Sequence, residues 1–342
     1  MSTQQAAPTS TDMPAPAPGP VSRRPSWLST GHLLSKYALI GVWALLALGF
    51  AVKMPDTFAT TSTFQAIFGS QSALLILALA ALATLVAGEF DLSFASTMGL
   101  AATILPVLAT LHGVATWLSC LIALGGALLC GAINAFFVVV LDVPSLVVTL
   151  GSASFFLGLS ELIGGSTSVA ISDPKLTNLV VHRFFGLPLS FYYGVALALV
   201  FAYVLTWMPL GRHIAFVGAN RDVARLAGIN VAAIRAGSYM VAALIAGLAG
   251  IVIDASIGGF DPVGGSVYLL PSIAAVFLGT AVVHPGQFNP IGTLIGIYFL
   301  STGVMGLQLL GYNGWVQNAF YGGGLVVAVS IAAIVRRRVG VG

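Results

Sequence analysis

Charged side chains are scarce in this sequence. Only 7% of the 342 residues are charged, 13 basic and 10 acidic side chains, against roughly 25% in soluble globular domains. So few charges cannot cover the surface of a soluble protein, and 58% of the residues are hydrophobic. A water-soluble enzyme and a disordered chain are excluded, and so is an outer-membrane barrel, because barrel strands alternate apolar and polar residues. The composition predicts an all-α, polytopic transmembrane helical bundle.

Lysine and cysteine are almost absent. The three lysines are Lys36, Lys53 and Lys175, and none follows a glycine, so the chain has no P-loop to bind the phosphates of ATP. Cys120 and Cys130 form neither a disulfide framework nor a metal-site spacing. Since no hydrolytic triad or HExxH pattern is present either, we expect no enzyme activity, no metal and no cofactor. Any ATP must be bound by a partner subunit.

Uncharged runs mark the expected spans. The hydrophobic residues number about 198, enough for about ten spans of roughly 20 residues each. We predict a membrane domain over residues 36–335, between a disordered N-terminal tail, 1–35, and a C-terminal tail, 336–342. The expected spans lie within residues 37–52, 57–88, 92–141 (two spans, turning at Pro106 and His112-Gly113), 143–160, 190–208, 236–253 and 262–335 (three spans).

The basic residues predict the orientation of these spans. With the N-terminus inside, ten spans place ten of the 13 basic residues on the cytoplasmic side, as the positive-inside rule requires. Both termini are then cytoplasmic. The net charge of +3 and the pI near 9.0 reflect this placement in a lipid bilayer, and we expect no nucleic-acid binding.

The most informative segment is the expected cytoplasmic loop, about residues 211–230. Asn220 is a good N-cap for a short helix, with Asp222 in the first turn, where the helix dipole favours an acid. Gly228 follows the last turn, where a left-handed residue ends many helices. Arg221 and Arg225 lie four residues apart on one side. Two interpretations remain open: a helix that docks on a cytoplasmic partner, or a surface connector.

This loop resembles the coupling loop of the ribose-type sugar permeases of ATP-binding-cassette importers. The matching residues are Gly211, Arg212, Gly218, Asn220, Ala224, Arg225, Leu226, Gly228, Ile229, Asn230 and Val231. Segments 90–96, 274–279 and 292–296 are also similar to family motifs. The resemblance covers about residues 60–335. It implies that Gly218, Asn220, Arg221, Ala224, Arg225, Leu226, Gly228 and Ile229 couple the chain to an ATPase.

The resemblance further implies a permease subunit of a bacterial importer for a sugar or related polyol, located in the inner membrane. Its expected partners are an ABC ATPase subunit, a periplasmic solute-binding protein and a second permease, either identical or homologous. One alternative is a branched-chain amino acid permease, and another is an ion-coupled secondary carrier. The chain departs from the family at Glu89, where glycine is usual, and such departures make ribose a poor guess for the solute.

A few polar residues fall within or beside the expected spans. Ionisable groups in lipid are costly and are functional candidates by default. We name Asp91, Ser93 and Asn134 as candidates for the solute path, with helix capping as the alternative for Asp91 and interhelical hydrogen bonding as the alternative for Asn134. Glu161 and Asp254, near outer span ends, are expected to be hydrated carboxylates.

Overall fold

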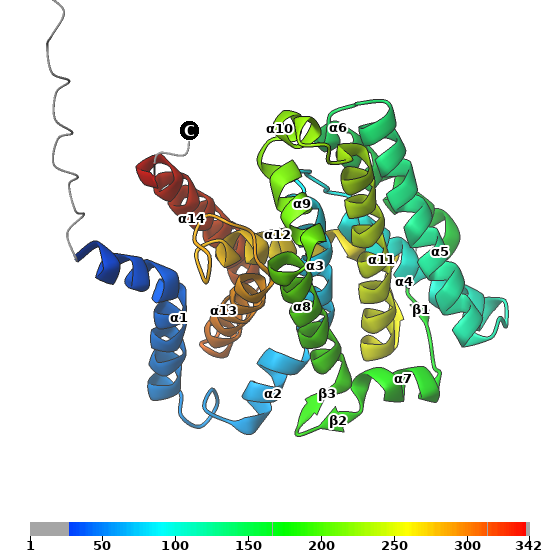
Figure 1. Cartoon of the computed structure of the whole chain (residues 1–342). Coiled ribbons are helices and arrows are strands. Elements are labelled where there is room, and N and C mark those ends of the chain that lie inside the picture. The colour runs from blue at the N-terminus through cyan, green and yellow to red at the C-terminus, as the bar shows by residue number, and fades with distance from the viewer. Residues whose placement is uncertain (1–26, 166, 313, 340–342) are drawn as a thin grey trace, which may run out of the picture.

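The computed structural model describes residues 27–165, 167–312 and 314–339 (Figure 1). This part of the chain is a bundle of helices with two small two-stranded sheets. The α-helices are α1 (Trp27–Lys53), α2 (Thr61–Gly69), α3 (Ser72–Val86), α4 (Phe94–Pro106), α5 (Thr116–Ala135), α6 (Ser145–Gly164), α7 (Pro174–Val181), α8 (Leu189–Trp207), α9 (Pro209–Ala219), α10 (Arg221–Leu226), α11 (Val231–Ile257), α12 (Leu269–Gly279), α13 (Pro290–Leu309) and α14 (Trp315–Val339). π-helical turns extend α4 to Leu111 and α5 to Val140, and a 3-10 turn, Gly264–Tyr268, precedes α12.

Seven helical segments among the described residues are long and apolar enough to cross a membrane. They are Thr61–Val86, Phe94–Leu111, Thr116–Val140, Ser145–Gly164, Leu189–Trp207, Val231–Ile257 and Pro290–Leu309. Residues 37–53 and 264–279 form shorter apolar helices. The all-α, polytopic architecture is therefore as predicted, while the number of ten spans stays a prediction.

Several predicted boundaries shift. The window 57–88 holds two helices, α2 and α3, which meet at an angle (Figure 1). Pro106 is the last α-helical residue of α4 rather than a turn, and the chain turns at His112-Gly113, where Gly113 has a φ of 63°. Most of the predicted tail, 1–35, lies outside the described residues, but residues 27–35 already belong to α1. Likewise, α14 continues through residues 336–339 of the predicted C-terminal tail.

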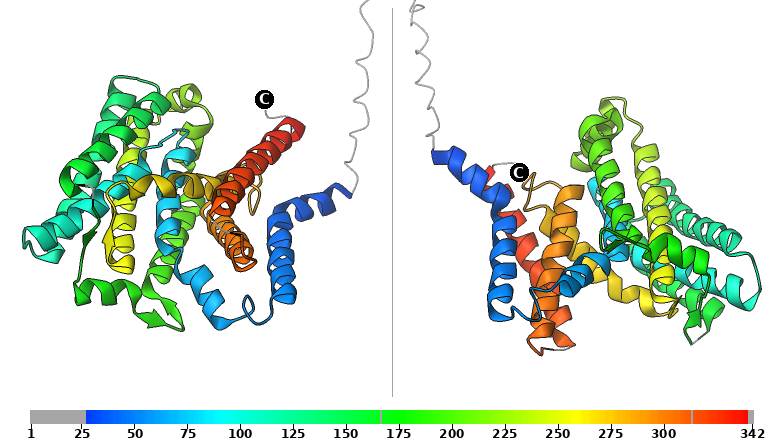
Figure 2. Two further views of the ribbon diagram at one scale, coloured as in Figure 1. Left: turned by 180° about the vertical axis from the view of Figure 1, so that it is seen from behind. Right: turned by 90° about the horizontal axis from the view of Figure 1, so that it is seen from below.

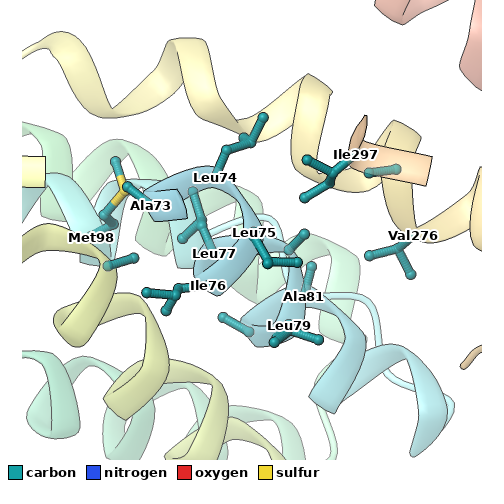
Figure 3. Packing of buried hydrophobic residues seen from close by; sticks show 14 of the residues in the cluster. Ala73, Leu74, Leu75, Ile76, Leu77, Leu79, Ala81, Met98, Val276 and Ile297 are labelled. Atoms are coloured by element: carbon teal, nitrogen blue, oxygen red, sulfur yellow. The ribbon is translucent and has the colours of Figure 1, made fainter. Parts of the chain in front are cut away.

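Helix α3 lies in the middle of the bundle. Figure 2 shows α1, α13 and α14 on one side of the molecule and α5 and α6 on the other. Nearly every side chain of α3 is buried, among them Leu75, Leu77 and Leu79, and Val276 of α12 and Ile297 of α13 belong to the same cluster (Figure 3). A helix with apolar side chains on every side can be enclosed on every side, and α3 is buried by its neighbours in this way.

The two small sheets lie at one end of the bundle, and α10 lies at the other (Figure 1). Strand β1 (Val169–Ala170) pairs antiparallel with β4 (Gly259–Phe260) and joins the segment before α7 to the end of α11. Strands β2 (Arg183–Phe184) and β3 (Leu187–Pro188) form a hairpin that leads directly into α8. We call this end, with α2, α7 and the β2–β3 hairpin, the hairpin end.

Glycines let the helices approach closely, as small residues do in membrane bundles. At Gly131 of α5, a Cβ atom would lie 2.6 Å from the Ala243 Cβ atom and 2.8 Å from the Tyr239 carbonyl oxygen of α11. Gly125 lies six residues earlier on the same helix and has no such neighbour within 4 Å.

This difference predicts opposite effects of the same substitution. Gly131→Ala should destabilise the bundle by about 1–3 kcal/mol, because the added methyl group overpacks the contact between α5 and α11. Gly125→Ala should leave stability unchanged or raise it by up to about 1 kcal/mol, because alanine is the better helix former. Thermal unfolding of both variants in detergent measures the difference, and equal melting temperatures would contradict the packing of α5 on α11.

Candidate functional site

Helix α10 begins as its sequence predicts. The Asn220 side chain accepts hydrogen bonds from the backbone N–H groups of Asp222, at 3.0 Å, and Val223, at 3.1 Å. Asp222 lies in the first turn, where its charge complements the helix dipole. The predicted N-cap is confirmed.

The end of α10 is equally well defined. Gly228 has a φ of 78°, its N–H donates to the Arg225 carbonyl at 3.0 Å, and the Ile229 N–H donates to the Ala224 carbonyl at 3.1 Å. This pair of bonds is a Schellman motif, which requires a left-handed residue at the glycine position. The role of Gly228 at the end of the helix is also confirmed.

The inner face of α10 packs on its neighbours. Ala224 is fully buried in a cluster with Val217 of α9 and Val231 of α11, and Ile229 packs against the same cluster. The Asn230 side chain accepts a hydrogen bond from the Ala233 N–H at 3.0 Å and so caps α11. The segment between α9 and α11 therefore has little freedom to move by itself.

Helix α9 rests on the backbone at the end of α3. The Gly218 backbone lies so close to the Val86 carbonyl oxygen and to Gly88 that any Cβ atom at either glycine would crowd the other segment. Gly88 also has a φ of 75°, which disfavours a side chain there. Gly218 is thus required by a close approach of two backbones.

The Arg221 side chain is 40% exposed but reaches the segment after α3. Its Nη2 atom donates to the Gly88 carbonyl at 3.0 Å and to Glu89 Oε1 at 2.9 Å. Glu89 is 1% exposed and also accepts hydrogen bonds from two residues of α11, namely Arg235 through Nε and Tyr239 through its hydroxyl at 3.3 Å. We call these four residues the Glu89 cluster.

The cluster connects further to the end of α5. Arg235 donates to the Val138 carbonyl at 3.2 Å, and its Nη1 atom lies 3.7 Å from Asp142 Oδ1. One buried carboxylate thereby joins α10, the loop before α4 and α11, with the end of α5 attached through Arg235. The sequence analysis did not identify Arg235 and Tyr239. Their spacing of four residues places them on one face of a helix, and the unusual Glu89 could have suggested a search for basic partners.

The outer face of α10 is open. Leu226 is 88% exposed, and Val223, Asp222 and Arg225 are exposed as well. The two arginines therefore differ in their surroundings, because Arg221 binds Glu89 while Arg225 is exposed. A cavity of about 750 Å³, lined by residues such as Glu89, Gly218, Ala219 and Phe288, lies beside the end of α9.

The three solute-path candidates lie together but are buried. Asp91 accepts hydrogen bonds from the Ser93 N–H at 2.8 Å and hydroxyl at 2.7 Å, and Asn134 of α5 donates to the Ser93 hydroxyl at 2.6 Å. Burial raises the pKa of the Asp91 carboxyl, and the hydrogen bonds from Ser93 oppose that rise. None of the three lines the 750 Å³ cavity beside α9. The contact of Asn134 with Ser93 matches the interhelical alternative for Asn134. Asp91 is not the N-cap residue, because α4 begins at Phe94 with Ser93 at the N-cap position, and Asp91 binds Ser93 instead.

Asp254 differs from its prediction. It is fully buried in α11, and neither carboxylate oxygen has a hydrogen-bond partner among the described residues. The expectation of a hydrated carboxylate is wrong here, because α11 turns this face toward its neighbours rather than toward the end of the span. Glu161 is exposed.

Seven apolar candidate spans and a rigid, capped helix at one end define a multi-pass membrane protein. The family described as "Branched-chain amino acid transport system / permease component" matches residues 63–329. The chain belongs to this family of transport permeases.

Individual relatives are similar over most of their length. The D-allose transport system permease protein AlsC of Escherichia coli (strain K12) is 26% identical over 305 residues, 88% of this chain and 93% of that protein. The L-arabinose transport system permease protein AraH of the same strain is 28% identical over 304 residues, 89% and 92% of the two chains. The autoinducer 2 import system permease protein LsrD of Photorhabdus laumondii is 30% identical over 260 residues, 74% and 78%. No solved structure matches the chain.

The Glu89 cluster generates a prediction about stability. Glu89→Ala should destabilise the protein by about 3 kcal/mol, because it leaves the buried Arg235 without its main partner. Asp142→Ala removes the other carboxylate near Arg235, but that side chain is 88% exposed, so the cost should stay below about 1 kcal/mol. Thermal unfolding in detergent compares the two variants. A smaller effect of Glu89→Ala than of Asp142→Ala would show that the cluster does not hold the segments together.

Proposed function

We propose that this chain is the permease subunit of an ATP-binding-cassette importer that carries a sugar or related polyol across the inner membrane. The proposal is supported by the curated relatives, whose names assign them to transport of D-allose, L-arabinose and autoinducer 2. Each of these proteins is covered over more than two thirds of its length.

The exposed face of α10 is the observation that carries the mechanism. An exposed leucine flanked by a valine and an arginine, on a helix capped at both ends, suits insertion into a groove of a partner. An ATPase subunit is the partner that an importer without a P-loop of its own requires. Gly218, Asn220, Ala224, Gly228 and Ile229 then shape and hold the helix, while Arg225 and Leu226 contact the ATPase.

The Glu89 cluster supplies the route from the ATPase to the membrane domain. When the ATPase subunits close, a displacement of α10 pulls on Glu89 through Arg221. Glu89 is bound to residues of α11, and it lies three residues after the end of α3 in the sequence. Helices α3 and α11 therefore shift together with α10. Alternating access at a pair of permeases, identical or homologous, is the expected result.

This mechanism sets the orientation in the bilayer. Helix α10 faces the cytoplasm, and the hairpin end faces the periplasm, where a solute-binding protein delivers the solute. With ten spans, both termini lie in the cytoplasm. The positive-inside distribution of lysine and arginine in the sequence supports this orientation.

Branched-chain amino acid transport is the second candidate, because the matching family carries that description. The segment Asp91-Leu92-Ser93-Phe94-Ala95-Ser96 is similar to the sugar-permease motif instead. The identity of the solute therefore has to be measured directly.

Thermal unfolding of the cognate binding protein provides that measurement. We expect D-allose, L-arabinose, D-fructose or a related polyol to raise its melting temperature, because a ligand that binds only the folded state stabilises it. Leucine and valine should have no effect. Stabilisation by leucine or valine alone would contradict the sugar proposal and indicate that the importer carries amino acids.

Substitutions on α10 test the coupling mechanism. Arg225→Glu and Leu226→Asp should each weaken ATPase binding by about 30-fold or more, since a lost interface anchor costs at least about 2 kcal/mol. Both side chains are exposed, so membrane insertion should stay normal. The readouts are co-purification of the ATPase and ATP-dependent uptake.

Lys175→Glu, a charge reversal on α7 at the hairpin end, serves as the control and should leave ATPase binding unchanged. If Arg225→Glu and Leu226→Asp retain the ATPase and transport normally, α10 is only a connector.

A further inference from the structure

A cavity of about 500 Å³ is lined by residues of the hairpin end. It lies between α2, the start of α3, the end of α11 and the β2–β3 hairpin. Cavities that hold small molecules span about 300–1,000 Å³. Its lining includes five serines, one glutamine and one arginine, and no acidic or aromatic side chain.

Two polar side chains of the lining hold each other in place. Arg183 of the hairpin donates through Nη1 to Gln65 Oε1 of α2 at 2.6 Å, across 118 residues of sequence. This bond occupies the amide oxygen of Gln65 and identifies its Nε2 group as a donor. Gly186 has a φ of 82°, and a Cβ atom there would lie 3.0 Å from Gln65 Nε2, so the hairpin turn leaves room for the amide.

Ser190 lines the same cavity from the first turn of α8. It is only 2% exposed. A serine hydroxyl has one hydrogen to donate and two lone pairs that accept hydrogen bonds. Ser190 therefore offers both a donor and an acceptor to an occupant of the cavity.

Two further serines offer acceptors. The Ser72 hydroxyl donates to the Gly69 carbonyl at 2.8 Å, and the Ser256 hydroxyl donates to the Val252 carbonyl at 2.6 Å. Each oxygen keeps lone pairs for a ligand. Ala73 and Ile253 add apolar contacts. An occupant must hence carry several groups that both donate and accept hydrogen bonds, as the hydroxyl groups of a sugar do.

We infer that this cavity binds a polyhydroxy solute of monosaccharide size on the periplasmic side, before the solute crosses the membrane. The inference rests on the proposed function. An amino acid fits the cavity poorly, because no lining carboxylate is present to pair with its ammonium group. Helices α3 and α11 both run from this cavity to the Glu89 cluster, so an occupied cavity lies against the same two helices that α10 moves.

Thiol labelling tests the site in the full-length chain with its ATPase, in right-side-out membrane vesicles. In a background with Cys120→Ala and Cys130→Ala, Ser190→Cys and Ser256→Cys place a thiol in the cavity. Ser172→Cys, exposed near α7 and outside the cavity lining, is the matched control. The reagent is a membrane-impermeant methanethiosulfonate, and the probes are D-allose, L-arabinose, D-fructose and leucine at millimolar concentration.

We expect at least one of the three sugars to slow labelling of Ser190→Cys by about three-fold or more, which corresponds to a sugar concentration of about twice the Kd. Leucine should not slow it, and no probe should slow labelling of Ser172→Cys. Ser256→Cys lies at an exposed position, so it reports on the cavity if Ser190→Cys proves unreactive or unstable. Absence of protection by every sugar at the reactive cavity thiol would overturn the inference. Protection that needs the binding protein and no sugar would also overturn it, because the cavity would then be a contact for that protein.

ATP-dependent uptake by the complete importer separates this inference from the proposed function. Uptake of a sugar without any protection of the cavity thiols would refute the cavity and leave the permease assignment intact. Absence of uptake for all three sugars, together with leucine uptake, would refute the proposed function itself.

Discussion

The buried carboxylate of Glu89 is the interaction on which the arrangement of the α10 end depends. A charge removed from water is tolerated only where opposite charges and hydrogen bonds replace its hydration. Glu89 meets this condition with Arg221, Arg235 and Tyr239, which come from two separate helices. The condition cannot be met unless α10 and α11 both lie against the loop before α4. Their relative position is therefore specified by one side chain as well as by apolar packing.

The rest of the bundle is built around α3. This helix has no polar face, so it can be enclosed on all sides, and α8, α11, α12 and α13 pack against it. Glycines such as Gly131 and Gly218 allow neighbouring helices to pack closely against each other. Helices α3 and α11 both extend from the polar cavity at the hairpin end to the Glu89 cluster at the opposite end of the bundle. In the proposed mechanism, these two helices connect movements at the two ends.

Much of the fold can be predicted from composition and from local sequence patterns. Uncharged runs locate the apolar helices because lipid requires long apolar segments with all backbone hydrogen bonds satisfied internally. The limits of α10 follow from Asn220 and Gly228, since each acts on backbone groups only a few residues away. Boundaries such as the one between α2 and α3 are harder to predict, because no charged or glycine-proline break separates Gly69 from Ser72.

The class of protein, the helical architecture and the short helix with capped ends could be predicted from the amino-acid sequence. Three features depend on how the helices pack: Arg221 binds Glu89 while Arg225 is exposed, Asn134 reaches Ser93 across 41 residues, and Asp254 is buried. The tertiary structure also decided that Gln65 and Arg183 enclose a cavity with Ser190. The reason is physical: a cap depends on neighbours along the chain, whereas the partner of a buried polar group is chosen by how distant helices pack.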